Sequence, residues 1–327
     1  MSDGRAGNAR QATALASALA AIAGQATADA GGAAVEATAP HDELTLHLRA
    51  PWCWLAPRQL PGGASHAFGA EFARSLSAPP GIAIGCGRQA ALATRLLGDA
   101  GSMTVQILDP RLDPSLWDIV VAPQHDRLRG RNVITTLGSL HPVDDTWLAR
   151  ARGQFPDFGT LPGPRTAVLL GGSSLHARFD RMAFEVMASK LEAVLANDGG
   201  SVLLTTSRRT PRELRQVLAH RYDDTPGIVW RGECDQPNPY PGLLAWADRI
   251  VCSPDSVNMI TEACATRVPV FVFDPGRVRG RPRQFLDALL ASGRIRAMDN
   301  TLAPYEVEPL RETARVAVEV HERLTGG

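Results

Sequence analysis

Residues 247–263 read ADRIVCSPDSVNMITEA, and this stretch decides the fold class. A short apolar strand enters a Ser-Pro-Asp-Ser turn, and a helix leaves that turn. The same alternation of strand and helix patterns recurs on either side of this stretch, in both halves of the chain. Such alternation predicts parallel sheets that are covered by helices on both faces.

The alternation breaks once, between residues 143 and 165, where Asp, Arg, Gly and three Pro replace the apolar runs. A chain of 327 residues suits two domains, so the break predicts a linker between them. The first domain is expected over residues 1–150 and the second over 160–304, with a helix at 305–324 crossing back to the first. The turn at residues 2–8 looks like one that follows a first strand, yet no strand precedes it. Either the fold does without that strand or the sequence starts downstream of it.

The composition of the chain excludes several kinds of partner and binding site. The 34 basic and 34 acidic residues give a net charge of zero, which argues against a general nucleic-acid partner. Lys190 is the sole lysine, so a P-loop lysine is excluded and phosphate must be held by arginine, backbone N–H groups and hydroxyls. The five cysteines show no C-x-x-C spacing, and no metal site is predicted. Without a leader or a membrane-length apolar run, the cytoplasm is the expected location.

Small and hydroxyl-bearing residues follow three strands of the second half. Ligands in parallel α/β sheets bind at the carboxyl ends of strands, where helix N-termini attract anions, so these loops are candidates for a diphosphate site. Glu262, nearly two turns along the last helix, could accept hydrogen bonds from a ribose. The plainer alternative is ordinary capped turns and a solvated Glu262. The loops are Gly171-Gly172-Ser173-Ser174, Thr205-Thr206-Ser207-Arg208-Arg209 and Ser253-Pro254-Asp255-Ser256.

Two glycine-rich turns open helices in the first half. One is Ser-Asp-Gly-Arg-Ala-Gly-Asn at residues 2–8, and the other is Gly-Cys-Gly-Arg-Gln-Ala at residues 85–90. The second matches G-x-G-x-x-A, with Asp109 ending the next strand, and so keeps an NAD(P)-dependent oxidoreductase open as an alternative. Such a fingerprint usually follows the first strand of its domain, which this one does not. Nearby, Trp52 and Trp54 indicate either an acceptor or membrane-facing lip or an ordinary packed loop.

Seven segments together resemble the mitochondrial fission protein family of the elongated-mitochondria type. They occur in the expected order between residue 2 and about residue 273. They read SDGRAGNARQ, GCGRQAA, VQILDPR, VVAPQHD, LLGGSS, TTSRRTP and CSPDSVNMITEA. Bacterial members of that family are assigned as glycosyltransferases by their fold. The resemblance implies a bacterial α/β protein with two Rossmann-like domains facing a cleft, the glycosyltransferase-B architecture.

The resemblance also implies roles for individual residues. A nucleotide sugar would be the co-substrate, with no bound cofactor or metal. Asp3, His125 and Asp126 are three candidates for the base that deprotonates the acceptor hydroxyl, and the sequence does not choose among them. The acceptor side would include Gly4, Arg5, Gly7, Asn8, Gly87, Arg88 and Gln89. The donor nucleotide would be held by Gly171, Gly172, Ser173, Ser174, Thr206, Ser207, Arg208, Ser253, Asp255, Ser256, Asn258 and Glu262.

The predicted function is hexosyltransferase-type transfer of a sugar to a hydroxyl acceptor. By analogy with related enzymes the acceptor would be a cell-envelope glycan or a lipid-linked precursor. The protein would act in the cytoplasm or at the cytoplasmic face of the inner membrane, which it would contact peripherally. A non-catalytic scaffold of the fission-protein type is a further alternative. The sequence leaves open the sugar, the base, the stereochemical outcome and the oligomeric state.

Overall fold

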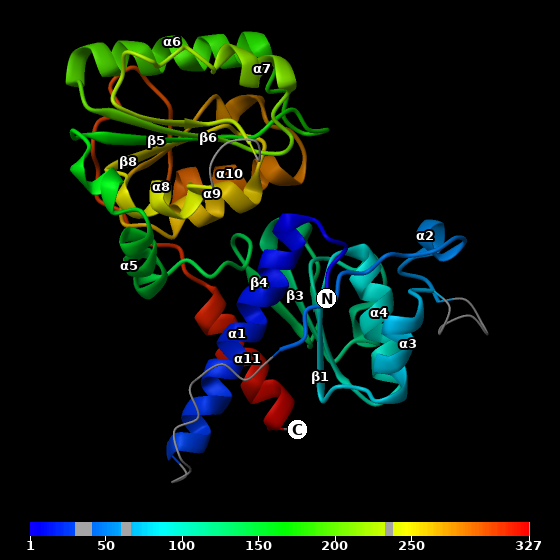
Figure 1. Cartoon of the computed structure of the whole chain (residues 1–327). Helices are drawn as coiled ribbons and strands as arrows, with labels where there is room; N and C mark the ends of the chain where they lie inside the picture. The colour runs from blue at the N-terminus through cyan, green and yellow to red at the C-terminus, as the bar shows by residue number, and fades with distance from the viewer. Residues whose placement is uncertain (30–40, 60–66, 233–237, 327) are drawn as a thin grey trace. The chain divides into compact units, whose positions relative to one another are not determined.

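The computed structural model describes residues 1–29, 41–59, 67–232 and 238–326, and it divides into two compact units (Figure 1). The first unit comprises Met1–Pro142 and Glu312–Gly327, and the second comprises Val143–Arg311. The chain therefore passes from one unit to the other at two points, after Pro142 and after Arg311. Within the described residues, every helix is too short or too polar to cross a bilayer.

The first unit is built on a parallel sheet with the strand order β1-β2-β3-β4. Helices α1 and α11 cover one face of this sheet, and α3 and α4 cover the other (Figure 1). Every residue of β3 is buried, as expected for a strand covered on both sides. The elements are α1 (Ala6–Asp29), α2 (Trp52–Leu55), α3 (Ala70–Ser77), β1 (Ile82–Cys86), α4 (Arg88–Asp99), β2 (Met103–Ile107), η2 (Pro114–Leu116), β3 (Ile119–Pro123), η3 (Gln124–Asp126), β4 (Val133–Thr136) and α11 (Thr313–Thr325).

The sheet continues past β1 through Ser2. This residue forms parallel bridges with Cys86 of β1 on one side and with Thr45 on the other. The first residues of the chain thus lie in the position of a sheet strand, at its carboxyl end. Since α1 follows Ser2 on one face and α4 follows β1 on the opposite face, the sheet has its topological switch point between Ser2 and β1.

The C-terminal helix begins later than its predicted start at residue 305. Residues up to Arg311 are tied to the second unit: the Tyr305 hydroxyl donates to the Val270 carbonyl at 2.8 Å, and the Leu310 N–H donates to the Cys264 carbonyl. Helix α11 starts only at Thr313 and packs on α1 in the core of the first unit. Pro309 explains the difference, because proline has no N–H to donate and disfavours helical backbone at the residue before it.

The second unit has a six-stranded parallel sheet in the order β10-β9-β8-β5-β6-β7, the Rossmann strand order. Helices α6 and α7 lie on one face, and α8, α9 and α10 on the other (Figure 1). The elements are α5 (Asp145–Gln154), η4 (Pro156–Thr160), β5 (Arg165–Leu170), α6 (Arg181–Asp198), β6 (Ser201–Thr206), α7 (Arg212–Val217), β7 (Gly227–Trp230), α8 (Tyr240–Trp246), β8 (Arg249–Cys252), α9 (Val257–Cys264), β9 (Val270–Val272), η5 (Pro275–Arg277), α10 (Arg281–Ala291) and β10 (Arg296–Ala297). Two Rossmann-like α/β domains are thereby confirmed.

The segment predicted as a linker is instead folded onto the second unit. Asp144 caps α5 by accepting the Trp147 N–H at 2.7 Å, and Leu148 of that helix is buried. Asp145 forms ion pairs with Arg267 at 2.9 Å and with Arg311 at 2.8 Å, which hold its pKa well below the usual range. The charged composition that suggested a linker therefore belongs to a solvent-facing helix anchored by ion pairs.

Candidate functional site

The carboxyl ends of β5 and β8 form the switch point of the second sheet. These strands are neighbours, and the helices that follow them, α6 and α9, lie on opposite faces. At such a point the two strand-to-helix loops diverge, and parallel α/β proteins bind ligands there. The Gly171 loop follows β5 and the Ser253 loop follows β8, so the structure brings together two of the predicted donor loops.

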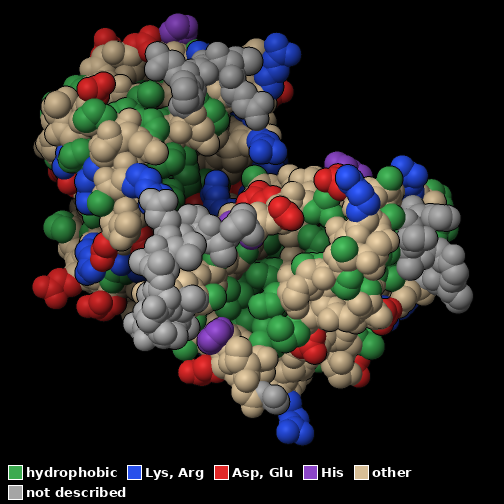
Figure 2. Space-filling view, turned by 60° about the horizontal axis from the view of Figure 1, so that its bottom comes forward, with side chains coloured by type: hydrophobic (Ala, Val, Ile, Leu, Met, Phe, Trp, Pro, Cys, Tyr) green, Lys and Arg blue, Asp and Glu red, His purple; other side chains and the backbone are tan. Residues whose placement is uncertain are grey.

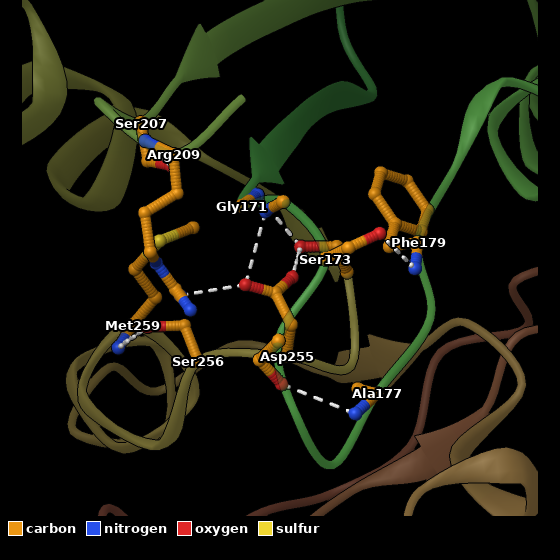
Figure 3. A network of polar contacts seen from close by, with 12 residues as sticks. Gly171, Ser173, Ala177, Phe179, Ser207, Arg209, Asp255, Ser256 and Met259 are labelled. Atoms are coloured by element: carbon orange, nitrogen blue, oxygen red, sulfur yellow. Dashed lines mark hydrogen bonds and ion pairs between the residues drawn. The ribbon is translucent and has the colours of Figure 1, made fainter. Parts of the chain in front are cut away.

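Hydrogen bonds join these two loops directly (Figure 3). The Gly171 N–H donates to Ser253 Oγ at 2.7 Å, and the Gly172 N–H donates to Asp255 Oδ2 at 3.0 Å. A Cβ atom added to Gly171 would overlap with the Asp255 carboxylate, and one added to Gly172 would overlap with the Arg209 backbone. Both glycines are therefore required by close approach of their neighbours, and both amides already have acceptors within the loop cluster.

Asp255 is the centre of this cluster. Its side chain has no exposed surface, and it accepts hydrogen bonds from the Gly172 N–H, from Ser253 Oγ at 2.6 Å and from Arg209 Nη2 at 2.6 Å. A buried carboxylate needs a cation and hydrogen-bond donors to offset its loss of hydration, and these three groups supply them. The contacts identify Asp255 as the residue that orders the loops, rather than as a group facing an anionic ligand.

Arg209 belongs to one of the loops predicted to hold a diphosphate, but the roles implied by the resemblance were given to its neighbour Arg208. Both side chains are exposed, but the structure distinguishes them by contact: Arg209 points toward Asp255 across the carboxyl end of the sheet and pairs with it (Figure 3). The Arg209 side chain keeps 46% of its surface exposed, so part of the guanidinium faces solvent beside the loops. Both arginines lie in the loop after β6, and no signal in the sequence separates one from the other.

Thr210 fixes the loop that carries Arg209. It is buried, and its hydroxyl oxygen lies 2.5 Å from the Gly171 carbonyl and accepts the Ser207 N–H at 3.0 Å. The loop after β6 is therefore tied to the loop after β5. As a result, all three predicted donor loops form a single hydrogen-bonded cluster at one edge of the sheet.

Helix α9 directs its N-terminus toward this cluster. Ser256 is the N-cap and accepts the Met259 N–H at 3.4 Å, while Val257 and Asn258 in the first turn are partly exposed. The first amides of a helix lack intrahelical acceptors, and with the helix dipole they favour an anion. Arg209 and this helix start together make the cluster suited to a phosphate group.

The remaining predicted donor residues have other surroundings. The hydroxyls of Ser173 and Ser174 accept backbone N–H groups from Phe179 and Ala177, so they shape the loop. Thr206, the last residue of β6, is buried. Glu262 is only 2% exposed, so the alternative of a solvated residue is wrong; its contact with a ribose stays a prediction.

In the first unit, the predicted acceptor-side loops meet at the switch point between Ser2 and β1. Asp3 accepts the Asn8 side-chain amide at 2.9 Å and the Arg5 N–H at 3.2 Å. Gly87 approaches Asn8 so closely that an added Cβ would lie 2.6 Å from Asn8 Nδ2. The Asn8 side chain therefore lies between Asp3 and Gly87 and contacts both. Gly4 has a φ of +74°, which permits the tight turn after Asp3.

The other first-unit candidates are spread along the sheet edge. The Arg88 guanidinium donates to the Cys53 carbonyl at 3.0 Å and so ties α2 to the loop after β1, while Gln89 follows in α4. His125 and Asp126 lie in η3, after β3. Two strands, β1 and β2, lie between Ser2 and β3. At the usual spacing of neighbouring strands, His125 and Asp126 are therefore about 14 Å from Asp3. The structure does not bring the three predicted bases together.

The buried cysteines near these loops offer no nucleophile. Burial raises the pKa of the thiols of Cys86 and Cys252, and it raises the pKa of Cys264 to about 12. These thiols are therefore neutral at physiological pH and pack as small apolar side chains. Asp109, the acidic residue of the oxidoreductase alternative, accepts the Arg111 N–H at 2.8 Å within its own turn.

The fold and the cluster define a class: a two-domain parallel α/β protein with an anion-suited loop cluster at the switch point of its second sheet. The sequence profile described as Mitochondrial fission ELM1 matches residues 6–324, and the chain belongs to this family. The resemblance seen in the sequence motifs is thereby confirmed.

Two relatives and two solved structures illustrate the similarity. The mitochondrial fission protein ELM1 of Arabidopsis thaliana is 30% identical over 276 residues, covering 75% of this chain and 64% of that protein. This chain thus spans less than two thirds of that relative. An uncharacterized protein of Rickettsia prowazekii is 22% identical over 281 residues, covering 73% of this chain and 78% of that protein.

Among solved structures, MurG of Acinetobacter baumannii is 12% identical with a TM-score of 0.47, over 99% of this chain and 90% of its own. The wall teichoic acid polymerase TagF is 12% identical with a TM-score of 0.31, over 67% of this chain and 58% of its own.

Proposed function

We propose that this protein is a glycosyltransferase that uses a nucleoside-diphosphate sugar and transfers its sugar to a hydroxyl acceptor. The observation that supports the proposal most directly is the joining of three strand-to-helix loops around Asp255, with Arg209 and the start of α9 directed at the same edge. Such an edge can hold a diphosphate without lysine or metal, which matches the chain's near-exclusive use of arginine.

The proposal gives each part of the cluster a task. Arg209 and the first amides of α9 neutralise the negative charge that builds up on the diphosphate as the bond from its oxygen to the sugar C1 breaks. Asp255 holds Arg209 in position and is not itself a phosphate ligand. Glu262, on the second turn of α9, is proposed to accept the ribose hydroxyls once the nucleotide is bound.

Acceptor activation is assigned to the first unit. The acceptor oxygen forms its new bond to C1 while its proton passes to a base. Of the three predicted bases, Asp3 lies at the switch point, where parallel sheets bind ligands, and its side chain is 12% exposed. We therefore favour Asp3 over His125 and Asp126, which follow a strand further along the sheet.

An exposed aromatic residue suggests where the protein would contact the membrane that carries a lipid-linked acceptor. Trp54, in α2, has 74% of its surface exposed and is followed by the partly exposed Leu55. Helix α2 is tied to the loop after β1 by the hydrogen bond from Arg88 to Cys53. Tryptophan is favoured at membrane interfaces, so α2 is proposed as a peripheral contact beside the acceptor loops.

The test is thermal stabilisation by UDP, GDP, CDP, ADP, TDP, their sugar conjugates and NAD(P), measured on the wild type and on the Arg209→Gln/Asp255→Asn double variant. A ligand at 100 times its Kd stabilises the protein by about 2.7 kcal/mol, an easily measured shift. We expect one nucleoside diphosphate to stabilise the wild type and to lose this effect in the double variant, which keeps the loops free of an uncompensated charge.

Other results would favour other functions. Stabilisation by NAD(P) alone, lost when Gly87 is replaced, would support the oxidoreductase alternative instead. No stabilisation by any nucleotide would favour the non-catalytic scaffold that the name of the Arabidopsis relative suggests.

A further inference from the structure

Two arginines of the first unit have a backbone conformation that favours glycine. Arg111, in the loop after β2, has a φ of +61°, and Arg127, in the loop after β3, has a φ of +59°. Residues other than glycine rarely adopt positive φ, because the Cβ atom then approaches the following carbonyl oxygen. Glycine would fit each position with less strain, so the presence of an arginine side chain at both requires a reason beyond the turn itself.

Each of these arginines is followed by a leucine that anchors its loop. Leu112 and Leu128 are partly buried and pack on the same apolar cluster, which includes Trp117 and Val120. Because both leucines pack on one cluster, the two loops are fixed side by side. This anchoring accounts for the turns, but not for the arginines, since glycine would permit the same turns.

The two arginines occupy equivalent places on neighbouring strands. Arg111 is four residues beyond Ile107, the last residue of β2, and Arg127 is four residues beyond Pro123, the last residue of β3. These strands pair in parallel, so both arginines lie at the carboxyl end of the first sheet. Parallel α/β proteins bind their ligands at this end of the sheet.

Most of the surface of both guanidinium groups is open to solvent. Charged side chains of both signs lie on the first unit (Figure 2), so an anion site there needs arginines that neighbouring carboxylates do not fully occupy. The Arg111 Nε lies 3.4 Å from Asp109 Oδ2, but 64% of the arginine side chain stays exposed. Arg127 is exposed as well, and no carboxylate among the residues that the structure describes forms an ion pair with it. Both arginines can therefore accept an anionic ligand.

The distance from the Asp3 turn indicates which part of a ligand these arginines would reach. Counted from Ser2, β2 is the second strand along the sheet and β3 is the third. At the usual spacing, the loops of Arg111 and Arg127 are about 10 Å and about 14 Å from the Asp3 turn. The arginines are thus too far to touch a hydroxyl at Asp3, and they can contact a group on the opposite side of the sugar that carries this hydroxyl.

We propose that Arg111 and Arg127 bind a phosphate or diphosphate group of the acceptor, on the far side of the acceptor sugar from the hydroxyl that Asp3 deprotonates. This inference rests on the proposed function and names the class of acceptor, a sugar phosphate that is either free or joined to a lipid. Guanidinium groups on two adjacent loops match the several oxygens of such a group. The phosphate takes no part in the bond changes; its binding orients the acceptor hydroxyl.

The experiment measures the binding of glucose 1-phosphate, inorganic pyrophosphate and farnesyl diphosphate by titration calorimetry. The full chain carries Arg209→Gln/Asp255→Asn, which removes the cation of the second unit's cluster. Adding Arg111→Gly or Arg127→Gly should raise the Kd of the bound probe about tenfold each, because each change removes charge-assisted hydrogen bonds. Arg129→Gln, a change of a neighbouring exposed arginine, is the matched control and should leave the Kd unchanged. Tightest binding of glucose 1-phosphate would indicate a free sugar phosphate, and tightest binding of farnesyl diphosphate a lipid-linked one.

Thermal denaturation separates a role in binding from a role in the fold. Glycine relieves the left-handed backbone, so Arg111→Gly and Arg127→Gly should keep or raise the Tm, while Arg127→Ala should weaken binding equally without raising the Tm. A fall in Tm of more than about 4 °C in both glycine variants would show that the arginines serve the fold, and would overturn the proposal.

Two binding results would also overturn it: no probe binds, or the probes bind with the same Kd when Arg111 or Arg127 is replaced. The nucleotide test of the proposed function is independent of these results, because it reports on the second unit. If a nucleoside diphosphate stabilises the wild type and the three probes do not bind, only the acceptor assignment fails. If the probes bind through the two arginines and no nucleotide stabilises the protein, the phosphate site stands and the glycosyltransferase proposal fails.

Discussion

Arg209 Nη2 lies 2.6 Å from Asp255 Oδ2, and the Asp255 side chain is fully buried while the arginine is half exposed. This pair connects the loop after β6 with the loop after β8, two strands that are separated in the sheet by β5. The arginine is thus held over the middle of the switch point by a carboxylate that solvent does not reach.

Replacing Arg209 by Gln should lower the free energy of unfolding by about 1–3 kcal/mol, because the buried Asp255 carboxylate loses its cation. Urea denaturation measures this directly. The Arg209→Gln/Asp255→Asn variant should recover most of the loss, and Arg208→Gln should stay within about 0.5 kcal/mol of the wild type. If Arg208→Gln and Arg209→Gln were equally destabilised, the ion pair would not have the importance assigned to it.

Gly171→Ala should destabilise the protein by about 1–3 kcal/mol, since the new methyl group would overlap with the Asp255 carboxylate. The matched control is Gly153→Ala, in the exposed part of α5, where an added Cβ meets no atom within 4 Å. That control should be neutral or stabilising by up to about 1 kcal/mol, because alanine favours helix. Thermal denaturation of the two variants side by side tests the close approach of the loops.

Asp3→Asn should reduce kcat for glycosyl transfer by about 10²–10⁴-fold if Asp3 is the acceptor base. The amide oxygen still accepts the hydrogen bond from Asn8, so the turn and the Tm should be retained. His125→Gln and Asp126→Asn are the comparison variants. A full loss of activity in either of them, with Asp3→Asn active, would move the base to the loop after β3.

The stability of the chain should rise with pH up to about the 8.0 of a free α-amine. Burial lowers the pKa of the Met1 amine in the folded state, so the unfolded chain binds more protons between the two pKa values. The contribution is fully present above pH 8 and is lost as pH falls through the lowered pKa. Acetylating the α-amine should remove this part of the pH dependence, as measured by urea denaturation from pH 5 to pH 9.

Trp54→Ser should weaken binding to vesicles of anionic phospholipid by about tenfold, because the exposed indole of α2 is the proposed point of contact. Leu175→Ser provides the control, since Leu175 is 99% exposed but belongs to the second unit. Co-sedimentation with vesicles compares the two. Equal loss in both variants would point to general surface hydrophobicity rather than to α2.

The fold class followed from the sequence because parallel strands covered on both faces are short apolar runs, and helical segments separate most of them here. Val270–Val272 and Ile119–Pro123 are examples that required no tertiary information. The segment 143–165 could not be placed in this way. Its charges are paired with Arg267 and Arg311, which are distant in sequence, and composition alone does not reveal such partners.

The sequence predicted which loops form the candidate site, but not which side chains of those loops point into it. Small and hydroxyl-bearing residues after each strand marked the three loops correctly as neighbours at the carboxyl edge. The choice between Arg208 and Arg209 depends on which side chain points back over the sheet, and adjacent residues in a turn give no periodic pattern to decide it. The burial of Asp255 and Glu262 likewise depends on packing that spacing does not reveal.

The return of α11 to pack on α1 has a consequence for the order of events on the ribosome. The second unit is one continuous segment, Val143–Arg311, and all of its strands have been synthesised before α11 exists. The first unit, although it begins at the N-terminus, leaves Leu15 and Leu19 without the Val316 and Val320 side chains that complete their core until the last residues leave the exit tunnel. The core of the first unit is therefore completed only by residues from the far end of the sequence, whereas the second unit needs no residue beyond Arg311.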